Sequence, residues 1–261
     1  MTESIDIAGP AAGSFPEKSR RRPWGVMASI IWVVLAFQVC GGAIDYLFAS
    51  PPLQALGHGS AIGHAVELFA AWALQLLVIV IAVLLARWPV AEYLGWVRPR
   101  AKDLAVGIAV VLVWSLAGSG IAYLTTGHAF NIAGYRAAVA AGTSPWWYVL
   151  QWWPAIFCAP IVEESAIRGF MWRGIEYRAG RFTAFLATSF YFTAMHYRYF
   201  LSLNGNSLVF SDVTFGSYVI SGLIYGWLRW RGNNTTVTII PHFVENLYVG
   251  LSDVIAAALV A

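Results

Sequence analysis

Long runs of apolar residues, separated by short charged segments, dominate this chain of 261 residues. Several of these runs exceed the roughly 20 residues that an α-helix needs to cross the hydrocarbon core of a bilayer. Only 11% of the residues are charged, against about 25% in soluble domains. We therefore predict an all-α fold, a polytopic transmembrane helical bundle with about seven to eight spans.

The apolar runs place the predicted spans at residues 26–48, 65–86, 104–124, 146–172, 182–199, 208–228 and 235–259. The first run is too long for the apolar part of a cleaved signal peptide, so it is interpreted as a span. The fourth and seventh runs are long enough to be tilted, broken or split in two. A loop at about 125–145 separates the third span from the fourth.

The basic residues predict an orientation for this layout. With the N-terminus inside, every lysine and arginine except Arg136, Arg168 and Arg198 lies in the cytoplasmic segments 1–25, 87–103, 173–181 and 229–233. This distribution follows the positive-inside rule. We predict an integral protein of a bacterial inner membrane with a cytoplasmic N-terminus. Because the basic residues flank spans, the net charge of +3 does not indicate a nucleic acid partner.

Several polar and ionisable residues fall inside the predicted spans. A charge at mid-bilayer costs roughly 2.5–3.5 kcal/mol on insertion scales, so such residues need partners or a function. The set comprises Glu163, Glu164, Arg168, His196, His242 and Asn246. Polar contacts that hold helices together are the alternative explanation. The combination of a glutamate, two histidines and an asparagine in three spans favours a functional site over polar contacts that only hold helices together.

The two adjacent glutamates are expected to differ in role. Glu164 and Arg168 are four residues apart, so on a helix they share a face and can form an ion pair. Glu163 is rotated by about 100° from Glu164 and points elsewhere. A buried carboxylate without a partner suits a general base or acid. Glu245 also lies in a span, and we expect a structural or interfacial role for it.

Helix rise predicts similar depths for the candidate residues. Glu163 should lie about 15 Å from Arg173 along its helix, and His242 about 16 Å from Arg231. His196 should lie about 22 Å from Arg181, which fits less well unless that helix is tilted or starts later. His242 and Asn246 share a helix face four residues apart, and Pro241 before them is expected to open or kink the helix. The residues can then meet near the midplane.

Three motifs in these spans resemble the CPBP family of intramembrane proteases, which includes the CAAX endopeptidases and the bacterial Abi proteins. The motifs are Glu-Glu-x-x-x-Arg at 163–168, Phe-x-x-x-His at 192–196 and His-x-x-x-Asn at 242–246. The resemblance covers roughly residues 100–250. It implies that Glu163 and His196 activate a water, that His242 and Asn246 stabilise the oxyanion, and that Glu164, Arg168 and Phe192 structure the site.

The resemblance suggests a division of the chain and a function. Residues 1–23 are predicted to be a disordered cytoplasmic tail, 24–100 the N-terminal transmembrane helices, and 101–261 a CPBP-like catalytic membrane core. The expected function is that of a hydrolase embedded in the lipid bilayer, an intramembrane endopeptidase that cleaves a membrane-associated protein or peptide with a water activated by glutamate and histidine. The alternatives are a non-enzymatic immunity or scaffold protein and a transporter with a Glu/His proton relay.

Metal dependence separates two versions of this mechanism. Glu163, His196 and His242 could form a zinc site with an open water position. The chain lacks a His-Glu-x-x-His helix, and Asn246 beside His242 suits two hydrogen-bond donors around an oxyanion. We therefore expect no metal and no other cofactor, with zinc as the alternative.

Overall fold

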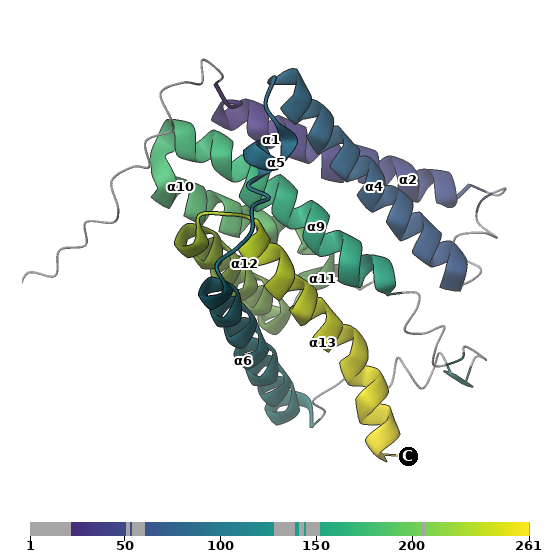
Figure 1. Cartoon of the computed structure of the whole chain (residues 1–261). Coiled ribbons are helices and arrows are strands. Elements are labelled where there is room, and N and C mark those ends of the chain that lie inside the picture. Colours follow the sequence, from purple (N-terminus) through teal and green to yellow (C-terminus); the bar gives the residue numbers. More distant parts are fainter. Residues whose placement is uncertain are drawn as a thin grey trace, which may run out of the picture.

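The computed structural model describes residues 22–50, 53, 61–127, 139–140, 144, 152–204 and 207–260. It is an α-helical membrane bundle, which confirms the predicted fold class (Figure 1). The predicted tail, apart from its last two residues, and most of the predicted loop at 125–145 lie outside the described residues.

The N-terminal helices coincide with the first three predicted spans. The first is continuous through α1 (Val26–Val34), the π-helical segment η1 (Leu35–Cys40) and α2 (Gly41–Phe48), and the next two are α4 (Ala61–Leu85) and α6 (Ala101–Thr126). Three helices in the described part of the chain are long and apolar enough to cross a membrane: Val26–Phe48, Ile62–Leu85 and Ala101–Thr125. A count of seven to eight spans stays a prediction. A short helix, α5 (Val90–Leu94), connects α4 to α6.

The C-terminal half begins with one long helix that contains two π-helical segments. It runs through η2 (Pro154–Cys158), α9 (Ala159–Glu164), η3 (Ser165–Met171) and into α10 (Trp172–Met195). Gly180 in α10 has φ 83° and ψ 169°, so the chain turns back there. A residue without a Cβ adopts this conformation at no steric cost. This turn separates the fourth predicted span from the fifth.

A β-hairpin that the sequence analysis did not predict follows α10. The chain continues through α11 (Tyr197–Phe200), β1 (Leu201–Asn204) and β2 (Ser207–Phe210) to α12 (Asp212–Gly232) and α13 (Thr236–Val260). The prediction that the sixth span begins at 208 is wrong by four residues, because β2 occupies that stretch. Helix α13 includes Pro241 within its helical range.

The helices pack closely around the middle of the long helix. Helix α10 packs against α12, and α6 against α13, while α1 and α4 cover η3 from the other side (Figure 1). Glycines permit the closest approaches: a Cβ on Gly222 would lie 2.7 Å from the Ser189 carbonyl oxygen, and one on Gly169 would lie 2.7 Å from that of Leu94. The N-terminal helices therefore contact the core that carries the predicted site.

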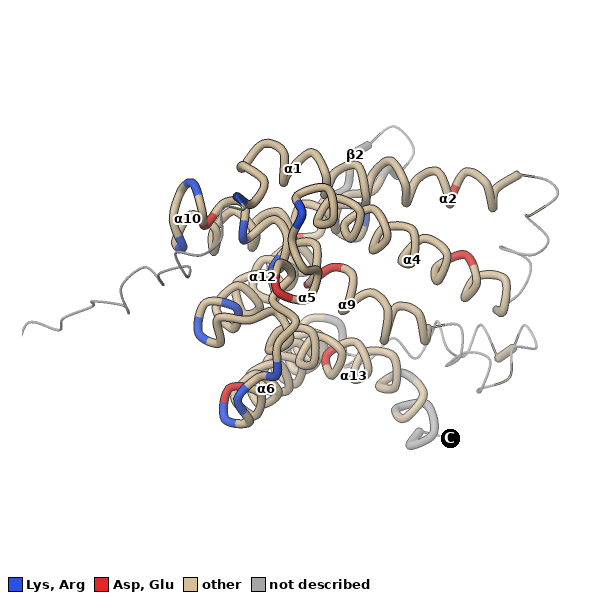
Figure 2. Tube along the Cα trace, turned by 45° about the horizontal axis from the view of Figure 1, so that its top comes forward, with Lys and Arg blue, Asp and Glu red and all other residues tan. Residues whose placement is uncertain are grey.

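The described basic residues gather at one end of the bundle. Figure 2 shows blue positions where α10 turns, where α12 ends and where α6 begins. Arg198 on α11 lies apart from them, 3.8 Å from Asp45 on α2. The helices thus have an arginine-rich end and an opposite end at which α11 and the hairpin lie.

Candidate active site

The candidate residues come from three helices that meet beside η3. Glu163 and Glu164 end α9, His196 directly follows α10, and His242 lies on α13. Glu163, Glu164 and His242 are all buried, at 4%, 0% and 5% exposure. The expected meeting of these residues inside the bundle agrees with the structure, including His196, whose predicted depth fitted least well.

Glu164 is paired on two sides. Its Oε1 accepts from Arg168 Nη1 at 3.2 Å, as expected from the four-residue spacing. The same oxygen lies 3.2 Å from His242 Nδ1. A carboxylate oxygen accepts, so this contact places a proton on Nδ1 of His242. Glu164 therefore joins α9, η3 and α13.

Glu163 points away from this pair. Its Oε2 has no hydrogen-bond partner among the described residues, and it lies 3.9 Å from His196 Nε2. His196 Nδ1 lies 2.7 Å from the Phe192 carbonyl oxygen. Because a carbonyl only accepts, Nδ1 carries the proton, and in the neutral imidazole the lone pair of Nε2 faces Glu163. A carboxylate and a basic nitrogen thus face one another without bonding directly.

Asn246 lies one turn after His242 on α13. Its Nδ2 donates to the Ala155 carbonyl oxygen in η2 at 2.9 Å, which uses one of its two amide hydrogens. The Phe192 ring contacts both imidazoles, with centroids 4.7 Å from His196 and 5.8 Å from His242. All seven residues of the three motifs therefore lie around one region of the bundle.

Helix α12 supplies a layer of the site that the sequence analysis missed. Tyr225 stacks on His242 at 4.6 Å and 23°, and Tyr218 stacks on His196 at 4.3 Å and 18°. The Tyr225 hydroxyl donates to Glu245, which also accepts from Ser221 at 3.1 Å. These α12 residues recur at spacings of three, four and seven, which places them on one helix face. That spacing, inside a predicted span, is the signal that could have revealed them.

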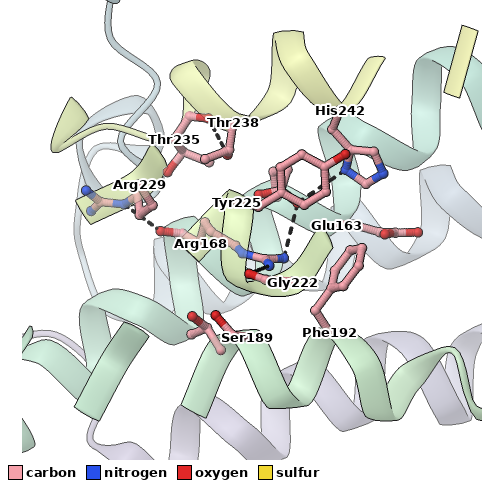
Figure 3. Close-up of polar contacts among 12 residues, drawn as sticks. Glu163, Arg168, Ser189, Phe192, Gly222, Tyr225, Arg229, Thr235, Thr238 and His242 are labelled. Carbon is pink, nitrogen blue, oxygen red and sulfur yellow. Dashed lines mark hydrogen bonds and ion pairs between the residues drawn. The ribbon is translucent and has the colours of Figure 1, made fainter. Parts of the chain in front are cut away.

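Arg168 is held by more than its ion pair. Its Nη2 donates to the Gly222 carbonyl at 3.0 Å, and its guanidinium lies 4.6 Å from the Phe192 ring centroid (Figure 3). Arg229 Nε in turn donates to the Arg168 carbonyl at 2.8 Å. Arg168 is fully buried and Arg229 is 4% exposed. Buried arginines with several partners fix the register of η3 against α12.

Comparison with known proteins identifies a family that part of the chain resembles. Residues 145–248 match the family model described as Type II CAAX prenyl endopeptidase Rce1-like. This segment resembles the Rce1-like proteases. It contains all three motifs, so the match confirms the resemblance that they predicted. No curated protein and no solved structure matches the chain.

The Rce1-like match bears on the protein's class. The family is one of proteases, and the match covers 104 of the 261 residues, so the likeness to a protease holds for this part of the chain. The apolar helices agree with an integral membrane protein. Residues 145–151, 205 and 206 of the match lie outside the described residues, whereas every motif residue lies inside them.

Proposed function

We propose that the protein is an intramembrane endopeptidase in which Glu163 and His196 activate a water molecule. The observation that carries the proposal is the facing arrangement of Glu163 Oε2 and His196 Nε2, 3.9 Å apart and directed away from the Glu164–Arg168 pair. Two acceptors at this separation can both bind the hydrogens of one water. A peptide bond needs such a nucleophile and donors for the developing charge.

The proposed reaction moves one proton from water to the leaving amine. Glu163 takes a proton as the water oxygen bonds to the scissile carbonyl carbon. The tetrahedral oxyanion accepts hydrogen bonds from the Asn246 amide and from the Nε2–H of a doubly protonated His242, whose Nδ1–H faces Glu164. Glu163 then passes the proton to the amide nitrogen, the C–N bond breaks, and a carboxylic acid and an amine are released, while Glu163 returns to its carboxylate form. Glu164 and Arg168 position His242 throughout.

We propose that this chemistry needs no metal. His242 Nδ1 faces Glu164, and His196 Nδ1 faces a backbone carbonyl, so each histidine has one nitrogen engaged. Within the described ranges, no three His, Cys, Asp or Glu side chains are grouped so that they could hold a metal ion. A zinc enzyme would lose activity to phenanthroline and regain it with added zinc. We expect the purified protein to retain activity with chelator and to contain less than stoichiometric zinc.

The Glu163→Gln variant tests the proposed nucleophile activation. The amide keeps the shape of the side chain but cannot take a proton from water. Membrane peptides from cells that express the wild type should contain cleavage products that are missing with Glu163→Gln, at equal protein levels. Identical peptide profiles in the two cell lines would overturn the proposed activity. The same comparison with purified proteins separates proteolysis from a proton relay, because only a protease forms cleavage products that Glu163→Gln fails to form.

A further inference from the structure

Side-chain exposure around the site changes along the bundle. Toward the arginine-rich end, the side chains are tightly packed: Phe170, Trp172 and Arg229 are at most 4% exposed. Toward the opposite end, the His196 side chain is 14% exposed. Tyr199, within the next turn, is 68% exposed. The described residues thus cover the site from the arginine-rich end and leave it more accessible where α11 leads into the hairpin.

Among the described residues the sheet consists of β1 and β2 alone, so each strand has an edge without a partner strand beside this access. Leu201 pairs with Phe210, Ser202 with Val209, Leu203 with Leu208 and Asn204 with Ser207. Ser211 N–H donates to the Phe200 carbonyl oxygen at 2.9 Å, so that pair is hydrogen-bonded. In an antiparallel ladder hydrogen-bonded and non-hydrogen-bonded pairs alternate. The N–H and C=O groups of Leu201 and Leu203, and of Leu208 and Phe210, therefore point outward from the two strands.

A substrate that is cleaved inside a membrane needs hydrogen-bond partners for its own backbone N–H and C=O groups. A peptide bond within a helix has its N–H and C=O in helical hydrogen bonds, and cleavage requires that segment to unwind. Unwound backbone in an apolar surrounding is unfavourable as long as its N–H and C=O groups lack hydrogen-bond partners. A free strand edge supplies partners for an extended peptide. The one-turn helix α11 spans about 6 Å, so a few extended residues bridge the site and the edge.

We propose that an extended segment of the substrate adds to the β1–β2 hairpin as a third strand, entering from the end opposite the arginines. The occupant is a membrane protein segment that unwinds beside His196. This inference rests on the proposed endopeptidase function and names how that function recognises its substrate. Side chains at alternate positions of the added strand would face the aromatic residues around Tyr199 and Phe210.

Proline substitutions on the two edges test the pairing. Leu203→Pro and Leu208→Pro each remove one outward N–H, and since this pair is not hydrogen-bonded, the hairpin keeps its own bonds. The matched controls are Leu203→Ala and Leu208→Ala, which remove the same side chains and keep the N–H. The readout is the set of membrane peptides that depends on Glu163, normalised to the protein level in the membrane.

We expect one proline variant to lower these products by roughly tenfold, about the effect of one lost hydrogen bond, while the alanine at that position stays near wild type. Wild-type product levels in both proline variants would overturn strand addition. So would equal losses for proline and alanine at each position, which would assign the effect to side chains. If no Glu163-dependent products exist, the proposed function itself fails, and the hairpin inference fails with it.

Discussion

Glu164 and Glu163 are neighbours in sequence with different surroundings. Glu164 accepts from Arg168 and contacts His242, whereas Glu163 Oε2 has no hydrogen-bond partner among the described residues. Adjacent positions on a helix are about 100° apart, so one residue faces the buried arginine and the other faces His196. Of the two neighbouring carboxylates, Glu164 therefore stabilises the structure, and Glu163, in our proposal, acts in catalysis.

Glu164→Ala should destabilise the protein far more than Glu163→Gln. It leaves the fully buried Arg168 without its carboxylate, and breaking a buried pair typically costs about 3–5 kcal/mol. Thermal unfolding of the detergent-solubilised variants measures the difference. Glu163→Gln should melt near the wild-type temperature. Similar losses in both variants would contradict the separate roles.

Tyr225→Phe should weaken the site through a single hydroxyl. The ring can still stack on His242, but Glu245 loses a donor, at a cost of about 1–2 kcal/mol. Tyr218→Phe is the matched control, because Tyr218 also stacks on a site histidine and its hydroxyl has no hydrogen bond to the described residues. We expect lower cleavage and a lower melting temperature for Tyr225→Phe alone. Equal behaviour of the two variants would remove the role assigned to Glu245.

At the scale of elements, the π-helical segment η3 lies directly beside the site. A π-helical turn adds a residue to the helical repeat and is frequent at functional positions. The i, i+4 contact from Glu164 to Arg168 is nevertheless kept, across the junction of α9 and η3. The sequence pattern predicted this contact from regular helix geometry, and it agrees with the structure although the helix is not regular.

Helix α12 depends on small residues where it meets α10. Gly222→Ala would bring a Cβ to 2.7 Å from the Ser189 backbone oxygen, so the helices must separate. Such overpacking costs about 1–3 kcal/mol. Gly216→Ala, on the same helix with open space around it, should instead be neutral or gain up to about 1 kcal/mol from helix propensity. Melting temperatures in detergent measure the stability of both variants. An unchanged melting temperature for Gly222→Ala would contradict close packing of α10 on α12.

At the scale of the whole molecule, the separation of the arginine-rich end from the hairpin predicts sidedness. From the positive-inside rule we expect the arginine-rich end to be cytoplasmic and the hairpin to lie on the outer face. The exposed positions Leu208 and Arg178 lie at the two ends, and each can be changed to cysteine after Cys40 and Cys158 are replaced by alanine. A membrane-impermeant maleimide should label Leu208→Cys in intact cells and Arg178→Cys only after lysis. The reverse pattern would invert the orientation and bring the substrate from the cytoplasm.

The sequence by itself determined the helical membrane class, the positions of the first three apolar helices and the split between Glu163 and Glu164. Each of these depends on local quantities, such as the length of an apolar run or the angle between neighbouring residues on a helix. Charge at mid-bilayer is so costly that the buried motif residues stand out against an apolar background.

Only the tertiary structure decided how α12 takes part. Tyr218, Tyr225 and Arg229 touch residues that are far away in the chain, and nothing within α12 shows which partner each will meet. The hairpin was likewise missed, because residues 201–210 form a short mixed stretch whose strands are defined by pairing with one another. Contacts between distant segments depend on how the helices pack, and that packing is set by the whole chain rather than by any one segment.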